Sequence, residues 1–560
     1  MSILRHLTVV SLVLLPWFQA GGGSASVGPV KSQAVPTPRL VVLVSLDQMR
    51  ADYVARYSHQ WTGGLKRLLT GGASFVSAAY PYLNTVTCPG HATISTGTFP
   101  RTHGLILNSW WDRELGRSVD CLADSTVVAL PYNVPGARSG GFGPRDLRAP
   151  TYGDELRGHT SGASRVFSAA VKARSAIALA GARGDLVVWV DQGGLTTSTA
   201  FTPARSPFVE DFVRRHSLDA ELGRDWTRLL PADQYLQADA DAAERPPAGW
   251  THVFPHAIGT GADAGRRAGL WSASPLVDEY LGRLMEEAVA REGLGTREVP
   301  DLLAISFSSL DSVGHAFGPD SHEVQDALIR IDRVLGRLFD TIDREVGAGR
   351  YVVALSADHG VAPIPERAAR TGLDAGRVDL AAASAAVESA LGRRFGPGKY
   401  VSRAVYTDLY LAPGVLARVQ SDPEAWADVS TALRGVRGVD RVIRADEVTS
   451  PFATDDPALR AARLSYFPGR SGDIIIVPRP YWILSTAATT HGSLHGYDTR
   501  VPLVLYGAGI RPGTYRDQAS PADIAPTLAA LTGVTMSRAE GRVLIEALAA
   551  GDQRTPAIAR

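Results

Sequence analysis

The chain has 560 residues, of which 45% are hydrophobic and 20% are charged, as expected for a folded globular protein. This length predicts either several domains or one large α/β domain with insertions. The 57 basic and 57 acidic residues cancel, which argues against nucleic acid or an anionic membrane as the main partner.

The N-terminus has the pattern of a secretory signal. Arg5 precedes an apolar run at residues 7–18, and small residues follow in AGGGSASVG. We therefore interpret residues 1–25 as a signal peptide and 26–38 as a linker. A membrane anchor is the alternative, although the run is short for a span. No later stretch predicts a transmembrane helix, so a periplasmic or secreted protein is expected.

Apolar, β-branched runs recur along the chain and predict strands that are buried on both faces of a sheet. They are residues 40–46, a run around Val187, residues 302–307 and 351–355, and the segments SGDIIIVPRP and VPLVLYGAG. Helical stretches separate the runs, among them a clearly amphipathic one at residues 324–346. This alternation predicts an α/β fold with a largely parallel sheet.

Two regions differ from this pattern. Residues 196–275 and 365–470 are rich in Ala, Arg, Pro and Asp, and their strand-like runs are weaker. We interpret them as insertions that form a cap or accessory lobe on a catalytic domain of residues 39–560.

The segment LNTVTCPGHA, residues 83–92, leads into a predicted helix, because Pro89 favours a first helical turn. Thr87 would then lie at the helix N-terminus, where backbone amides and the helix dipole favour negative charge. A hydroxyl bound to a metal there can lose its proton and attack phosphorus. The alternative is that Thr87 is only an N-cap.

The sequence has two cysteines, Cys88 and Cys121. In an exported protein a pair predicts one disulfide, and two buried thiols are the alternative. Two cysteines are too few for a cysteine-based zinc site.

Carboxylates and histidines follow three of the predicted strands. Asp47, Asp311 and the pair Asp358-His359 each come shortly after such a strand, where parallel α/β sheets hold their working residues. His315 lies four residues after Asp311 and would share one face of a helical turn with it.

The segment THGSLHGYD near the C-terminus adds His491 and His495. Taken singly, each of these residues has an ordinary interpretation as a helix cap, a surface pair or a turn. Together they form a set of carboxylates and imidazoles without thiolates, which suits catalytic zinc or another divalent metal.

The motifs resemble those of the alkaline phosphatase superfamily over nearly the whole mature chain. SLDQMR, NTVTCPGHATISTG, HGLILNSWWDR, SLDSVGH, SADHG and THGSLHGYD occur in that family's order. Within that superfamily, the chain resembles the phosphate-irrepressible bacterial alkaline phosphatases, which use a Thr nucleophile. It shares Thr-x-Pro-x-His with nucleotide pyrophosphatase/phosphodiesterases. The resemblance implies a three-layer α/β/α sandwich.

The resemblance also implies a site with two zinc ions. One ion would be held by Asp311, His315 and His491, and the other by Asp47, Asp358 and His359. Thr87 would be the nucleophile and would form a phosphothreonine.

Three further residues match family positions that contact the phosphoryl group. Asn108 fits an Asn that hydrogen-bonds a phosphoryl oxygen, and Lys172 and Arg174 fit a Lys-x-Arg pair. A monoester dianion carries more charge on its non-bridging oxygens than a diester, so added cations favour monoesters.

The C-terminal motif departs from the family pattern, because His495 stands where an aromatic residue is usual. His495 is therefore an alternative ligand to His491, although His491 matches the HGS motif without a gap. Cys88 does not fit the C/S-x-P-x-R frame of sulfatases, which argues against sulfatase chemistry.

The function predicted from the sequence is an exported, metal-dependent alkaline phosphatase, which acts on small-molecule phosphate monoesters and is a monomer. One alternative is a phosphodiesterase or nucleotide pyrophosphatase with the same nucleophile and metals. The other is an inactive exported protein that binds zinc or phosphate.

Overall fold

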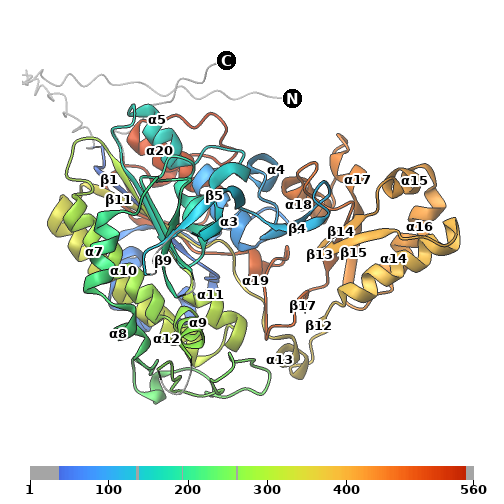
Figure 1. The fold of residues 1–560 in the computed structure, drawn as a ribbon, viewed down its shortest axis with the longest axis horizontal. Helices are drawn as coiled ribbons and strands as arrows, with labels where there is room; N and C mark the ends of the chain where they lie inside the picture. The colour runs from blue at the N-terminus through green and yellow to red at the C-terminus, as the bar shows by residue number, and fades with distance from the viewer. Residues whose placement is uncertain (1–36, 134–137, 192, 260–262, 550–560) are drawn as a thin grey trace, which may run out of the picture. The chain divides into compact units, whose positions relative to one another are not determined.

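The computed structural model describes residues 37–133, 138–191, 193–259 and 263–549, so the predicted signal peptide lies outside the described residues. An 11-stranded sheet forms its centre (Figure 1). Five neighbouring strands of this sheet run parallel, in the order β11 (Tyr351–Ser356), β1 (Leu40–Leu46), β10 (Asp301–Phe307), β7 (Val166–Ala170) and β8 (Leu186–Asp191). The predicted α/β class with a largely parallel sheet is confirmed.

The strands that flank this parallel centre pair mostly antiparallel. On one side lie β18 (Leu503–Gly507), β2 (Ala73–Phe75) and β19 (Gly513–Tyr515), of which β19 runs parallel to β2. On the other lie β9 (Gly194–Ser198), β5 (Ala123–Pro131) and β6 (Arg138–Phe142). The segment VPLVLYGAG was expected to join the parallel set, but β18 is antiparallel to β11.

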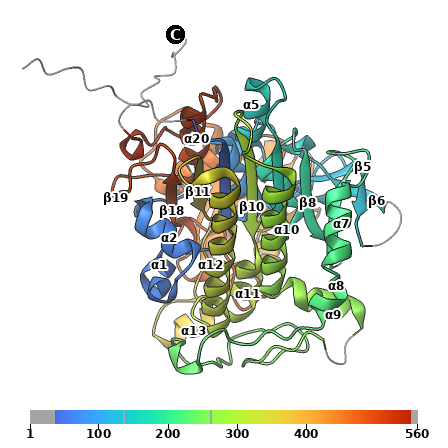
Figure 2. The same ribbon diagram turned by 90° about the vertical axis from the view of Figure 1, so that its left-hand side faces the viewer.

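Helices cover both faces of the central sheet because alternate side chains of its strands point to opposite faces. In β1, Leu40 and Val42 enter one core, whereas Val41 and Leu43 enter the other. The first core packs against α10 (Leu276–Glu292) and α12 (His322–Ile342), which lie side by side in Figure 2. The second packs against α3 (Thr87–Thr96), α6 (Ala173–Ala180) and α20 (Ile524–Thr532).

The amphipathic stretch predicted as a helix at residues 324–346 begins two residues earlier, as α12. The hydroxyl of Ser321 caps it by accepting a hydrogen bond from the Val324 amide at 3.2 Å. The helix continues as a π-helical turn over Asp343–Gly347.

A second, four-stranded sheet has a hydrophobic core of its own. Its strands are β13 (Val401–Val405), β14 (Asp408–Leu411), β16 (Ile474–Pro478) and β15 (Val439–Arg444), and α14 (Leu380–Phe395) and α16 (Pro423–Arg434) pack on it. The segment SGDIIIVPRP was expected to join the central sheet, but it belongs to this smaller sheet. An apolar run predicts a strand but not the partner with which the strand pairs.

The remaining elements are short. The strands are β3 (Ser109–Asp112), β4 (Arg117–Asp120), β12 (Gly376–Arg377) and β17 (Trp482–Ile483). The helices are α1 (Asp52–Tyr57), α2 (Gly64–Gly71), α4 (Pro100–His103), α5 (Tyr152–His159), α7 (Pro207–Arg215), α8 (Leu218–Leu222), α9 (Ala264–Ser272), α11 (Ser309–Phe317), α13 (Pro365–Arg370), α15 (Val415–Ser421), α17 (Ala445–Thr449), α18 (Pro457–Ser465) and α19 (Gly496–Thr499). Within the described ranges, none of the helices is both long and apolar enough to cross a bilayer.

Cys88 and Cys121 form a disulfide, as the pair of cysteines predicted. It joins the first turn of α3 to the residue that follows β4, and both cysteines are buried. The bond closes a loop with a sequence separation of 33 residues.

Replacing both cysteines by alanine should lower the free energy of unfolding by about 3–4 kcal/mol. The disulfide restricts the unfolded chain, and for a loop of this length the lost chain entropy corresponds to that free energy. Urea unfolding of the oxidised protein and the double variant measures the difference. Wild-type protein unfolded with a reductant should match the variant. Two free thiols in non-reduced peptides would contradict the pairing.

Candidate active site

The candidate site lies at the carboxyl ends of neighbouring parallel strands. Asp47 directly follows β1, and Asp358 and His359 follow β11. Asp311 and His315 lie in α11, which begins just after β10. Because β1 lies between β10 and β11, the three strands bring these residues to one edge of the sheet.

The first group of potential metal ligands is Asp47, Asp358 and His359, all fully buried. The Nε2 atom of His359 is 3.2 Å from Asp358 Oδ2 and 3.6 Å from Asp47 Oδ1. Among the described residues these three atoms have no hydrogen-bond partner. Buried polar atoms are rarely left unpaired, so these three converging atoms suit a bound cation.

The second group is Asp311, His315 and His491. The Nε2 atoms of the two histidines lie 3.2 and 3.5 Å from Asp311 Oδ1. Their Nδ1 atoms donate to the backbone carbonyls of Thr489 and Thr85, at 2.8 and 2.9 Å. A carbonyl can only accept, so Nδ1 carries the proton and Nε2 keeps a lone pair for a metal.

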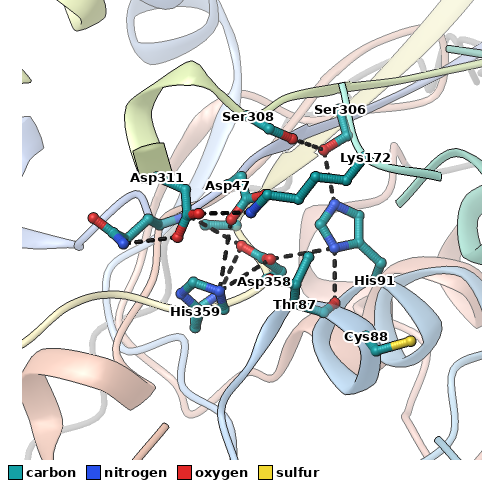
Figure 3. Close-up of polar contacts among 12 residues, drawn as sticks. Asp47, Thr87, Cys88, His91, Lys172, Ser306, Ser308, Asp311, Asp358 and His359 are labelled. Atoms are coloured by element: carbon teal, nitrogen blue, oxygen red, sulfur yellow. Dashed lines mark hydrogen bonds and ion pairs between the residues drawn. The ribbon is translucent and has the colours of Figure 1, made fainter. Parts of the chain in front are cut away.

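The two groups are adjacent. The rings of His359 and His491 stack with their centroids 3.4 Å apart. Lys172 lies between the groups, with Nζ 2.6 Å from both Asp47 Oδ2 and Asp311 Oδ2 (Figure 3).

The pKa values of the site reflect the burial of several charges together. Burial, and then the charge of Asp358, raises the pKa of Asp47 to about 6. Burial also tends to raise the pKa of Asp311, but Lys172 and His315 outweigh it and hold that pKa well below its usual range. A site with this concentration of buried carboxylate favours bound cations.

Together these features fit a site that binds metal ions. Each group offers three donor atoms that lie within 4.8 Å of one another. Imidazole nitrogen and carboxylate oxygen without thiolate suit zinc and other divalent metals.

Thr87 is the first residue of α3, and Val86 occupies the N-cap position, so the N-cap alternative for Thr87 is wrong. The helix packs closely on the first ligand group, because the space beside Gly90, where another residue would have its Cβ, is filled by Asp358. His91 Nδ1 lies 2.9 Å from the Thr87 carbonyl oxygen and 3.2 Å from Asp358 Oδ2. Figure 3 shows Thr87 and His91 beside Asp358.

Asn108 lies next to this helix. Its Oδ1 accepts a hydrogen bond from the Cys88 amide at 2.8 Å, so its amide NH₂ group is left to donate to another partner. Lys172 is the N-cap residue of α6, and Arg174 lies in the first turn of that helix. In the described part of the chain, Arg174 Nε is buried without a hydrogen-bond partner.

His495 lies apart from both ligand groups. Its Nε2 contacts the Pro478 carbonyl at 3.0 Å, and its ring lies against Tyr497. The structure therefore brings His491, and not His495, to Asp311.

Two buried residues of the site were not singled out from the sequence. The side-chain amide of Gln48 donates to Asp311 Oδ1 at 2.7 Å, and its backbone amide donates to Asp358 Oδ1 at 3.1 Å. His91 Nε2 lies 2.8 Å from Ser306 Oγ, which ties α3 to β10. The only sequence signal for Gln48 is that it follows Asp47, whereas His91 is the last residue of the Thr-x-Pro-x-His motif.

Comparison with known proteins identifies the family. Residues 41–498 match the type I phosphodiesterase / nucleotide pyrophosphatase family, and the chain belongs to it. Alkaline phosphatase PafA of Elizabethkingia meningoseptica is 32% identical, over 94% of this chain and 97% of its own. Alkaline phosphatase PhoV of Synechococcus elongatus is 31% identical, over 92% of this chain and 94% of its own.

Solved structures agree. Wild-type PafA superposes with a TM-score of 0.84 at 32% identity, covering 92% of this chain and 100% of that one. A PafA variant, in which a threonine is replaced by serine and an asparagine, a lysine and an arginine by alanine, gives 0.85 at 30% identity, over 92% of this chain and 100% of that one. The resemblance to alkaline phosphatases predicted from the motifs is confirmed.

Gly90→Ala should destabilise the protein by about 1–3 kcal/mol, because overpacking forces neighbouring atoms apart. The new Cβ would lie 2.3 Å from the Asp358 carbonyl oxygen and 2.6 Å from its Cβ. Gly392→Ala, in helix α14, is the control, since its Cβ would meet nothing within 4 Å. Urea unfolding measures both, and equal stabilities would show that α3 does not pack tightly on Asp358.

Proposed function

We propose that this protein is an exported, metal-dependent alkaline phosphatase, which hydrolyses small-molecule phosphate monoesters through a phosphothreonine at Thr87. The observation that carries the proposal is the position of Thr87 at the start of α3, beside two groups that each offer three metal donors. The names of its full-length relatives PafA and PhoV support the activity.

Two zinc ions are the cofactors proposed, one for each group of ligands. When bound, such ions favour ionised oxygen nucleophiles and neutralise charge on the phosphoryl and leaving-group oxygens. The donors of one ion are Asp47, Asp358 and His359, and those of the other are Asp311, His315 and His491. His491 is proposed as a ligand in place of His495.

Thr87 performs the covalent chemistry. Its Oγ1 loses its proton to solvent and bonds to phosphorus, while the ester oxygen leaves with the electron pair of its P–O bond and takes up a proton from water. Water then attacks the phosphothreonine, breaking the bond between phosphorus and Oγ and releasing phosphate. The N-terminus of α3 favours the negative charge on Oγ and on the phosphoryl oxygens.

Three polar side chains are proposed to bind the phosphoryl oxygens. The NH₂ group of Asn108 is free to donate, and Lys172 and Arg174 supply positive charge. In the PafA variant, the replaced threonine and asparagine have the same sequence separation as Thr87 and Asn108, and the replaced lysine and arginine the same as Lys172 and Arg174. Added cations favour a monoester over a diester.

The other features predicted from the sequence are part of the same proposal. Residues 1–25 direct export to the periplasm or beyond, and 39–560 form the catalytic domain with insertions at 196–275 and 365–470. The protein acts as a monomer and needs neither nucleic acid nor a membrane partner.

The deciding experiment compares nitrophenyl phosphate with bis-nitrophenyl phosphate at alkaline pH, using zinc-loaded and chelated mature protein. Zinc-dependent cleavage that strongly prefers the monoester is expected. A preference for the diester would instead make the protein a phosphodiesterase, the activity in its family's name. Bound zinc without cleavage of either ester would leave only a binding function.

Thr87→Ala should reduce monoester hydrolysis by at least about 10³-fold while zinc content is unchanged, because the nucleophile is lost and the ligands remain. Mass spectrometry of acid-quenched protein should find phosphate on wild type but not on the variant. Thr87→Ser retains a hydroxyl and is the matched control. Full activity of Thr87→Ala would exclude this nucleophile.

Lys172→Ala should slow monoester turnover by about 10²-fold and diester turnover by less, because the dianion depends more on the cation. Lys172 also contacts Asp47 and Asp311, so zinc content is measured in parallel. Equal losses for the two esters, at equal zinc content, would contradict its role with phosphate.

A further inference from the structure

The segment ahead of Thr87, residues 83–86, is buried and is held by side chains and loops from distant parts of the sequence. The Leu83 amide donates to Ser465 Oγ at 2.8 Å. Asn84 Oδ1 accepts from Thr407 Oγ1 at 2.9 Å. Both contacts come from the region of the four-stranded sheet, which thus supports the approach to the nucleophile.

Thr85 makes the contact that matters most for the site. Its Oγ1 donates to the Ser493 carbonyl at 2.8 Å, and its own carbonyl accepts from His491 Nδ1 at 2.9 Å. Two hydrogen bonds thus join one residue to both ends of the segment 491–493. Thr85 is fully buried, so water does not replace either bond.

Close packing also holds the segment 491–493 against the segment 83–86. Gly492, between the two bonded residues, has φ +103°, and a Cβ there would lie 2.5 Å from Tyr406 Oη and 2.8 Å from Val86 Cγ1. The C-terminal segment therefore passes against Val86 where only glycine fits.

The acceptor side of this contact is itself anchored. The amide and hydroxyl of Ser493 both donate to Asp498 Oδ2, at 2.8 and 2.5 Å. Asp498 is buried, and it lies in α19, so Ser493 is held to a helix.

From these contacts we infer that Thr85 is a positioning residue, which sets His491 relative to Thr87 by clamping the segment 491–493 to the start of α3. The inference rests on the proposed function, because it takes His491 to be a metal ligand and Thr87 to be the nucleophile. Thr85 binds neither substrate nor metal. It acts through His491, whose Nδ1–H donates a hydrogen bond to the Thr85 carbonyl, and through Thr87, two residues further along the chain.

The physical reason is that a metal-binding imidazole needs a fixed tautomer and ring orientation. Hydrogen bonds to the non-ligating nitrogen supply both, and their loss typically costs 10–100-fold in metal affinity or activity. Removing the Thr85 hydroxyl leaves the Thr85 backbone carbonyl in place but takes from the Ser493 carbonyl its buried donor, so the 491–493 segment can shift and misalign the His491 hydrogen bond. The other two proposed histidine ligands, His315 and His359, donate in the same way to the backbone carbonyls of Thr489 and Gly360.

The test uses Thr85→Val, which replaces the hydroxyl with a methyl group of similar size, and Thr85→Ser, which keeps the hydroxyl. Thr197→Val is the matched control, because Thr197 is also buried and donates to the Val187 carbonyl at 2.7 Å, in strand β9 of the central sheet. Zinc affinity is measured by competition with a chromophoric chelator, and kcat and KM with nitrophenyl phosphate.

We expect Thr85→Val to lose about 10–100-fold in the affinity of one zinc ion, and in kcat, with KM nearly unchanged. Thr85→Ser and Thr197→Val should bind both ions as wild type does. Wild-type zinc affinity in Thr85→Val, or an equal loss in Thr197→Val, would overturn the inference. Failure of the proposed function itself is distinguishable, because wild-type protein would then bind no zinc or cleave no phosphate ester.

Discussion

Three carboxylates, Asp47, Asp311 and Asp358, are buried where adjacent parallel strands end, and much of the structure around them follows from that constraint. Buried like charges are costly unless they are paired and hydrogen-bonded. Lys172 lies between two of them, and His91 approaches the third from α3. Among the described residues, Asp47 Oδ1, Asp358 Oδ2 and His359 Nε2 still have no hydrogen-bond partner, and these are atoms that suit a divalent cation.

The same constraint explains the rigidity around the site. Each of the histidines His315, His359 and His491 donates from Nδ1 to a backbone carbonyl, so each presents Nε2 to the carboxylates. Backbone acceptors move only if their segment moves. The orientation of the imidazoles therefore depends on the packing of whole segments, including the one that leads into Thr87 and contacts the four-stranded sheet.

Parts of this arrangement were predictable because their signals are local. The strands that precede Asp47, Asp311 and Asp358 are largely apolar runs, and Asp311 and His315 have helical spacing. Other parts were not. The strand at Ile474–Pro478 is as apolar as those of the central sheet, yet it pairs with β14 and β15. Its partners depend on the loops around it, which carry no periodic pattern.

The sequence by itself determined the class of fold and indicated the candidate ligands and the candidate nucleophile, because apolar runs, helical spacing and short motifs are properties of short segments. Only the tertiary structure showed that His491, and not His495, lies beside Asp311, since the two histidines are four residues apart and their positions depend on contacts with distant segments. It also revealed Gln48 and Thr85 as contacts of the site. Long-range hydrogen bonds join residues hundreds of positions apart, and no local pattern records them.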